Sequence, residues 1–231
     1  MNCGKSTFIY HFVKHIDKVC NTADIDEKFD LIFCYSSPSS LREFEDLSKA
    51  SHLIHNFESI LGLPSEKFIR HLSSNNEVHK MLIFEDLSYS INGLDSNYTK
   101  QLCNLILNSR HFNISIMHVL HQVPVNVKSK GLSFDKVMLQ NSTILVLFDG
   151  LLSNHERRLL VNRIMPGRYT EFVEMMEISA KICKQDREMY NSNPKPYLVV
   201  NLDSRQNIFH DLLNRIQCDI FKRWIVFTPG K

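Results

Sequence analysis

The sequence carries little excess charge of either sign, because 27 basic residues stand against 25 acidic ones. It therefore lacks the bulk positive charge typical of many DNA-binding proteins, and contact with DNA would need a local basic patch. No apolar run reaches the roughly 18 residues that a membrane-spanning helix requires. We also find no internal repeat and no low-complexity tract, which argues against a repeat or fibrous architecture.

The six cysteines include no C-x-x-C pair, which is the usual spacing of zinc ribbons and redox motifs. They lie in segments with the composition of helices and strands, and we see no secretory segment before them. We expect reduced, mostly buried thiols in an intracellular protein, with disulfides as the less favoured alternative. The positions are Cys3, Cys20, Cys34, Cys103, Cys183 and Cys218.

The sequence does contain enough apolar residues for a core, since 43% of its 231 residues are hydrophobic. A chain of this size fits one domain with a small appendage. We expect the domain to cover residues 1–204 and a helical tail to cover residues 205–231.

Short apolar runs alternate with amphipathic segments along most of the chain. Strands are predicted at 29–37, 81–85, 113–120, 142–148 and 196–202. Helices are predicted at 8–16, 40–48, 52–61, 64–75, 95–112, 133–142, 153–164, 169–181 and 205–223. The alternation predicts an α/β fold with a mostly parallel sheet flanked by helices, whose sites lie at the carboxyl ends of the strands.

The chain opens with the letters MNCGKST, whose last four match the end of the phosphate-binding pattern G-x-x-x-x-G-K-[ST]. Gly4 would let backbone N–H groups close on a phosphate, Lys5 would reach the β- and γ-phosphates, and Ser6 would ligate Mg²⁺. The predicted helix 8–16 would point its N-terminus at the phosphates. Four letters also arise by chance, and the alternative is an ordinary helix N-cap.

The same pattern, counted backwards, places Met1 on its third letter. Asn2, Cys3 and Thr7 would complete the nucleotide-binding loop around the glycine, lysine and serine. The leading glycine and the strand before it are then missing. We expect either a reading frame that begins upstream of this methionine or an eroded copy.

Two acids end the second buried strand, in the sequence MLIFED. Glu85 and Asp86 have the position of a Walker B pair, in which one acid holds Mg²⁺ and the other activates the attacking water. By position Glu85 takes the metal role and Asp86 the role of base, although the usual order begins with Asp. The alternative is a pair of solvated acids that cap a turn.

Two further polar residues complete the candidate catalytic set. Gln122 follows the third predicted strand, where a polar side chain can sense the γ-phosphate or orient water, and His121 beside it is more often structural. Arg110 ends the helix before that strand, and its guanidinium suits a transition-state phosphoryl group. The alternatives are a polar loop residue for Gln122 and a charge at a helix C-terminus for Arg110.

Taken in order, the segments NCGKST, LIFEDL, SRHFNISIMHVLHQ, NSTILVLF, RIMPGR and YLVVNL resemble the genome-packaging ATPases of the FtsK–HerA superfamily. The likeness is to those of large eukaryotic DNA viruses and Polinton/Maverick transposons, and it spans residues 1 to about 205. It implies a P-loop NTPase of the ASCE type that packages double-stranded DNA into a capsid. The reversed acid order and the truncated loop depart from the family.

The resemblance also implies cofactors and partners. It implies ATP and Mg²⁺, a homo-oligomeric ring, double-stranded DNA and a capsid or portal protein, with no membrane. Localisation would be the host nucleus, a cytoplasmic assembly site or the virion. The residues carried over are Lys5, Ser6, Glu85, Asp86, Gln122 and Arg110.

Other functions stay open at this stage. The chain could be another P-loop enzyme, such as a helicase-like ATPase, or an inactive relic that serves as a nucleotide-binding scaffold. A nucleotide kinase would need an arginine-rich lid, which we do not find. The lysines of segment 128–136 could hold DNA phosphates or could lie in a solvated loop.

Overall fold

The computed structural model describes residues 5–14, 30–38, 41, 44–45, 57–74, 76–87, 96–120, 134–148, 152–164, 166–190, 197–201 and 226–227. The chain divides into two compact units, and each is described by itself. One unit is Phe8–Asn141, and the other combines Met1–Thr7 with Ser142–Lys231.

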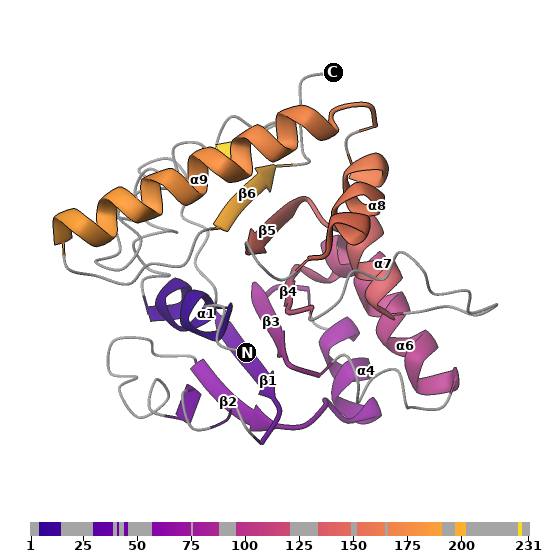
Figure 1. Cartoon of the computed structure of the whole chain (residues 1–231). Coiled ribbons are helices and arrows are strands. Elements are labelled where there is room, and N and C mark those ends of the chain that lie inside the picture. The colour runs from indigo at the N-terminus through magenta and orange to yellow at the C-terminus, as the bar shows by residue number, and fades with distance from the viewer. Residues whose placement is uncertain are drawn as a thin grey trace. The chain divides into compact units, whose positions relative to one another are not determined.

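The first unit is built on a four-stranded sheet in which every pair of neighbours is parallel (Figure 1). The strands are β1 (Leu31–Ser36), β2 (Phe57–Leu61), β3 (Lys80–Glu85) and β4 (Ile114–His118), in the spatial order β2-β1-β3-β4. The prediction of an α/β fold with a parallel sheet flanked by helices is confirmed for this unit.

The two central strands are buried along almost their whole length. All six residues of β3 are buried, as are five of the six in β1. Such strands have no solvent face, so their sequences read as continuous apolar runs rather than as alternating ones. This is why both strands could be predicted from their continuous apolar runs.

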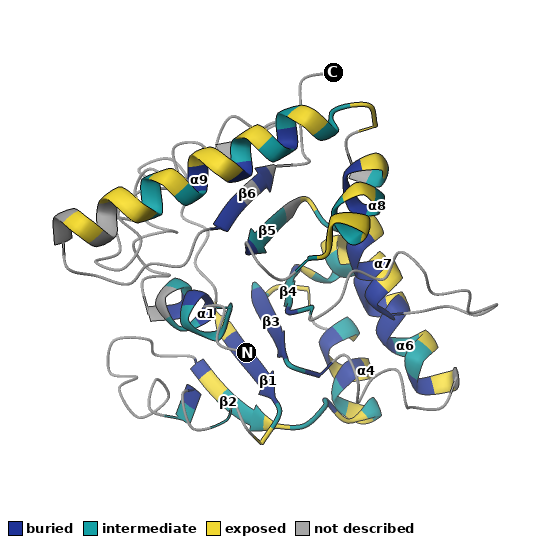
Figure 2. Ribbon diagram, in the orientation of Figure 1, coloured by how far each residue is buried: buried dark blue, intermediate teal, exposed yellow. Residues whose placement is uncertain are grey.

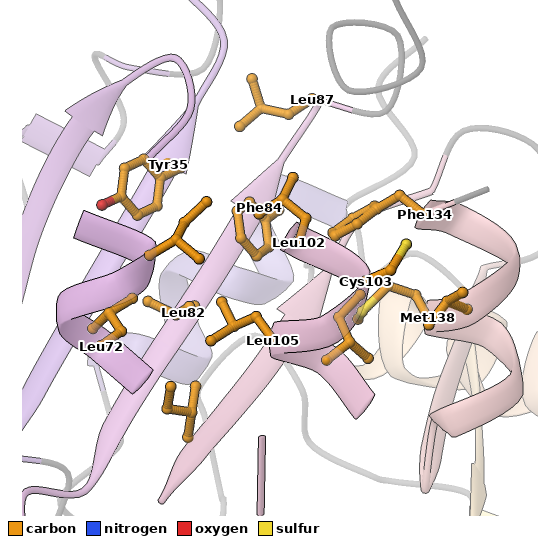
Figure 3. Close-up of a cluster of buried hydrophobic side chains, with 14 of the residues drawn as sticks. Tyr35, Leu72, Leu82, Phe84, Leu87, Leu102, Cys103, Leu105, Phe134 and Met138 are labelled. Carbon is orange, nitrogen blue, oxygen red and sulfur yellow. The ribbon is translucent and has the colours of Figure 1, made fainter. Parts of the chain in front are cut away.

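Three helices cover one face of this sheet. They are α4 (Glu66–Ser74), α6 (Ser96–Leu107) and α7 (Phe134–Asn141). Their apolar side chains form one cluster with every second strand residue, including Phe33, Tyr35, Leu82 and Phe84. Figure 3 shows Leu82 and Phe84 between Tyr35 and the α6 residues, and Figure 2 shows the same region as buried.

The intervening strand residues point to the opposite face, and they are just as well covered. Ile32, Cys34 and Ile83 are at most 1% exposed. Helix α1 (Lys5–Lys14) contributes the buried residues Phe8, Ile9 and Val13 to the core. Figure 1 draws the Phe8–Lys14 part of α1 beside β1, on the side away from α4 and α6.

The ends of α4 are satisfied by neighbouring polar groups. The Ser65 hydroxyl oxygen accepts a hydrogen bond from the Phe68 N–H at 3.2 Å, which confirms the predicted helix start at Pro64 and Ser65. The Tyr98 hydroxyl donates to the Pro64 carbonyl. At the other end the buried Lys80 amine donates to the Leu72 carbonyl at 3.5 Å, where a cation also favours the helix dipole.

The second unit has a smaller sheet in the order β5-β6-β7. Strand β6 (Tyr197–Asn201) pairs antiparallel with β5 (Ile144–Phe148) and parallel with β7 (Val226–Phe227). Helices α8 (Asn154–Ile164) and α9 (Tyr169–Tyr190) lie between β5 and β6 in sequence. Val161, Phe172, Met176, Leu198 and Val200 form its buried core.

The predicted helix over 52–61 is wrong, because residues 57–61 form strand β2. Phe57, Ile60 and Leu61 are spaced three and four apart, as on a helix face, so the pattern favoured the wrong element. Backbone pairing of Phe57 with Ile32 and of Ile60 with Tyr35 places the segment in the sheet instead.

The expectation of one mostly parallel sheet is also wrong for the second half of the chain. An apolar run identifies a strand but not its direction. Two parallel neighbouring strands are usually connected by one crossover helix. Here two helices, α8 and α9, lie between β5 and β6. The predicted tail helix 205–223 lies outside the described residues.

The remaining differences concern the lengths of helices. The predicted helix 95–112 is divided into α6 and the 3₁₀ helix η1 (Ser109–Phe112), which ends at Asn113 with φ of 53°. Helix α9 runs nine residues beyond the predicted end at 181. None of the described helices is both long and apolar enough to cross a membrane.

The buried cysteines Cys34 and Cys103 are free thiols, as expected. Cys34 and Cys103 are buried and Cys183 is half-buried, while the other three lie outside the described residues. Burial raises the pKa of the Cys34 thiol far above its usual range, and the nearby charge of Glu85 adds to this effect. Burial also raises the pKa of Cys103, to about 11.

These raised pKa values predict a loss of stability in alkali. Between pH 9 and 11 the thiols ionise in the unfolded chain, whereas in the folded chain Cys34 stays protonated and Cys103 ionises only near the upper end of the range. The unfolded state then binds fewer protons, so the free energy of unfolding falls by about 1.4 kcal/mol per pH unit for each such thiol. Urea unfolding across this pH range should show that the free energy of unfolding falls less steeply with pH for Cys34→Ala than for the wild type.

The half-buried Cys183 supplies the matched control, because Cys183→Ala should retain more of the wild-type slope than Cys34→Ala. Equal slopes for the wild type and Cys34→Ala would contradict the assignment of a protonated, buried thiol.

Candidate functional site

Buried polar residues meet where strands β1 and β3 end. Ser36 is the last residue of β1, Glu85 is the last residue of β3, and the two are direct partners in the parallel register. Ser36 is 0% exposed and Glu85 is 2% exposed. Both lie on the same face of the sheet as Cys34 and Ile83, opposite the α4–α6–α7 cluster. The carboxyl edge of the sheet is therefore the candidate site.

The residue after Glu85 has an unusual backbone conformation. Asp86 has a φ of 54°, which costs a non-glycine residue on the order of 1–3 kcal/mol. Its carboxylate accepts a hydrogen bond from the Ser37 hydroxyl at 3.3 Å, and the Ser37 N–H donates to the Glu85 carbonyl at 3.3 Å. The turn thus holds the Asp86 side chain beside the end of β1.

The carboxyl edge presents side-chain oxygens of the class that binds Mg²⁺. The buried Glu85 carboxylate is a hard oxygen donor, and the Ser36 hydroxyl has no hydrogen-bond partner among the described residues. Those residues hold no cluster of three or more His, Cys, Asp or Glu suited to a metal. Mg²⁺ commonly uses one or two carboxylates and takes its remaining ligands from phosphates and water, so the donor set fits that case.

On the other face, His118 forms a buried pair with Asp135. The His118 Nε2 lies 2.9 Å from the Asp135 Oδ1, and its Nδ1 lies 3.3 Å from the Phe84 carbonyl oxygen. The imidazole side chain is 1% exposed, and the Phe134 ring meets it edge-on with centroids 4.9 Å apart. The pair therefore fastens the start of α7 to the carboxyl ends of β3 and β4.

The residues of the phosphate-binding pattern lie partly outside the described structure. Asn2, Cys3 and Gly4 are not described, whereas Lys5, Ser6 and Thr7 form the half-buried first turn of α1. These three belong to the unit that does not contain Glu85 and Asp86, and the positions of the units relative to one another are not determined. The predicted meeting of Lys5 with Glu85 remains a prediction.

Arg110 lies at the opposite end of the sheet from Glu85. It is exposed in η1, and the following Asn113 carbonyl accepts a hydrogen bond from the Lys80 N–H at the start of β3. Five steps of about 3.3 Å separate that point from Glu85, roughly 16 Å in all. The structure therefore does not bring Arg110 and Glu85 together within one chain. His121 and Gln122 lie outside the described residues.

Sequence reasoning missed two residues of this region, Ser36 and Asp135. Ser36 follows an apolar run and could have been included by the rule that found Glu85, namely that sites lie at the carboxyl ends of parallel strands. Asp135 pairs with a residue 17 positions away and had no local signal. Comparison with protein-family models, curated proteins and solved structures found no match for this chain.

The His118–Asp135 pair yields a stability prediction. Asp135→Ala leaves a buried imidazole nitrogen without its acceptor and should lower the free energy of unfolding by about 1–3 kcal/mol. Asp135→Asn keeps an acceptor oxygen and should cost less. Urea denaturation monitored by circular dichroism measures both.

The adjacent Lys136 is exposed and provides the control. Lys136→Ala should change the free energy of unfolding by no more than about 0.5 kcal/mol. Equal losses for Asp135→Ala and Lys136→Ala would show that the pair does not stabilise the fold.

Proposed function

We propose that this chain is an ATP-driven motor ATPase of the DNA-packaging type, a P-loop NTPase of the ASCE type. The observation that carries the proposal is the buried Glu85, followed by Asp86, at the carboxyl edge of a parallel sheet. The chain's resemblance to genome-packaging ATPases of the FtsK–HerA superfamily, whose motifs it carries in the same order, supports the same assignment.

Nucleotide binding is assigned to the start of the chain. Lys5 neutralises the β- and γ-phosphates, Ser6 offers a hydroxyl to Mg²⁺, and backbone N–H groups from Asn2 to Thr7 cradle the phosphate oxygens. The start of α1 at Lys5 supports this role, because a helix N-terminus favours bound anions. The first turn of α1 contains no acidic residue that would repel a bound anion.

Hydrolysis is assigned to the two strand-end acids. Glu85 would hold the Mg²⁺ of the bound nucleotide, which stabilises negative charge on the transferring phosphoryl group when present. Asp86 accepts the proton of the water that attacks the γ-phosphorus, while the bond to the ADP oxygen breaks. Gln122 is the candidate to orient that water. Burial of Glu85 strengthens its electrostatic effect, because little water screens it.

Arg110 is assigned to the nucleotide of a neighbouring subunit. Its position at the amino end of the sheet supports action in trans rather than on a ligand at Glu85 of the same chain. This assignment requires a homo-oligomeric ring. Double-stranded DNA would be the moving partner, and a capsid or portal protein would receive it.

A helicase-like ATPase is the second candidate, and an inactive nucleotide-binding scaffold is the third. The reversed order of the acids, Glu before Asp, favours neither motor class. The form of nucleic acid that stimulates hydrolysis separates these functions.

The first test is ATP hydrolysis with double-stranded DNA, by the 231-residue chain and by a version with any in-frame codons that precede Met1. Lys5→Ala and Glu85→Gln should each lower the stimulated kcat by about 100-fold or more, because the first removes the cation beside the phosphates and the second removes the charge assigned to hold Mg²⁺. Phosphate release assays measure this effect.

Lys67→Ala and Glu58→Gln change exposed residues of α4 and β2 and should leave the rate unchanged. Stimulation by single-stranded DNA instead would favour the helicase. Wild-type protein that binds ATP without hydrolysing it would favour the scaffold.

Arg110 can be tested by mixing two inactive variants. Arg110→Ala should lower kcat by about 10³-fold, since arginine fingers contribute on that scale. If the arginine acts in trans, an equal mixture of Arg110→Ala with Glu85→Gln regains about a quarter of wild-type activity, because one interface in four combines both intact residues.

Arg70→Ala on the exposed face of α4 is the matched control for loss of a cation. A mixture no more active than its two components would refute action across a subunit interface.

A further inference from the structure

Ser36 presents a buried hydroxyl that no described residue satisfies. Its side chain is 0% exposed, and its Oγ has no hydrogen-bond partner among the described residues. Most buried side-chain hydroxyls are hydrogen-bonded, because an unsatisfied one destabilises the fold. A group of this kind therefore indicates either a bound water or a ligand.

The register places this hydroxyl beside Glu85. The two residues are partners on adjacent parallel strands, whose backbones lie about 4.8 Å apart. Ser59 on β2 pairs with Cys34, one step along the same face, and its hydroxyl is also buried without a partner in the described structure. Three oxygen-bearing side chains thus share one face, and two of them, Ser36 and Glu85, lie at its carboxyl edge.

The charges around Ser36 indicate what this face can hold. Glu85 and Asp86 are acidic, and the neighbouring Cys34 adds no positive charge. An anion placed directly against these carboxylates would be repelled. A water or a hard cation is favoured, because serine oxygens and carboxylates are ligands of that class.

We propose that Ser36 belongs to the metal site, where its hydroxyl holds a water of the Mg²⁺ shell beside Glu85. The inference rests on the proposed function, since the metal arrives with the nucleotide. Ser36 is a positioning residue in this role: it orients a metal-bound water and does not itself react. With Ser36 the site extends from β3 to β1, a strand from which the motifs had assigned no site residue.

A positioning role and a structural role predict opposite effects on stability. In the absence of metal and nucleotide, Ser36→Ala removes an unsatisfied hydroxyl and should raise Tm, by about 3 °C. A serine that mainly stabilises the fold would give a lower Tm on the same change. Differential scanning calorimetry in EDTA distinguishes these outcomes.

Metal affinity is the direct test, and it does not require turnover. Mn²⁺ binding in the presence of ADP is measured by electron paramagnetic resonance, using the full chain. Ser36→Ala should weaken Mn²⁺ binding about tenfold, the usual scale for groups that support metal ligands. Ser36→Thr keeps the hydroxyl and a strand-compatible side chain, and it should restore affinity to within about threefold.

Ser115→Ala is the matched control, because Ser115 lies on the same sheet face toward the amino end of β4, with its hydroxyl 3.4 Å from His79 Nε2. It should leave Mn²⁺ affinity unchanged. If Ser36→Ala binds Mn²⁺ as tightly as wild type, the inference is overturned and the proposed function stands. If the wild type binds no Mn²⁺ with ADP, both are overturned.

Discussion

The parallel register between β1 and β3 is the constraint on which the rest of the first unit depends. It pairs Phe33 with Leu82 and Tyr35 with Phe84 on one face, and Cys34 with Ile83 and Ser36 with Glu85 on the other. A slip of one residue would exchange these faces and would carry Glu85 toward the aromatic cluster. Because the apolar contacts of one face specify the register, they also specify where the acid lies on the other.

Both faces become polar at the same edge of the sheet. The face packed against α4 and α6 ends in the His118–Asp135 pair, and the opposite face ends in Ser36 and Glu85. At the amino end the buried cation is Lys80, which caps the last turn of α4. Removing charges from water is costly unless each is paired, so their concentration at strand ends keeps the apolar middle of the sheet intact.

Much of this arrangement could be predicted from the sequence, for definite physical reasons. Strands β1 and β3 are buried on both faces, so each is a continuous apolar run, and the acids that end β3 must lie at the carboxyl edge of a parallel sheet. Strand β2 was mistaken for a helix, because a half-buried five-residue segment with apolar residues three and four apart fits both periods.

Other features depend on contacts that no local pattern records. The direction of β6 relative to β5 follows from how two intervening helices return the chain, and the Asp135 partner of His118 is distant in sequence. The positive φ of Asp86 also could not be predicted, since nothing in the sequence Phe-Glu-Asp requires a left-handed residue. Ser36 was overlooked for a different reason, because a single serine after an apolar run looks like an ordinary strand end.

The length of the sheet limits how the candidate residues can cooperate. Glu85 ends β3, whereas Arg110 lies in the 3₁₀ helix before β4, three residues before Asn113, whose carbonyl accepts a hydrogen bond from the residue that begins β3. An arginine side chain spans about 7 Å from Cα to its guanidinium and cannot cover a separation of roughly 16 Å along the strands. If both residues act on one phosphoryl group, they must come from different chains. Assembly is then a condition of the chemistry, imposed by the number of residues in a buried strand.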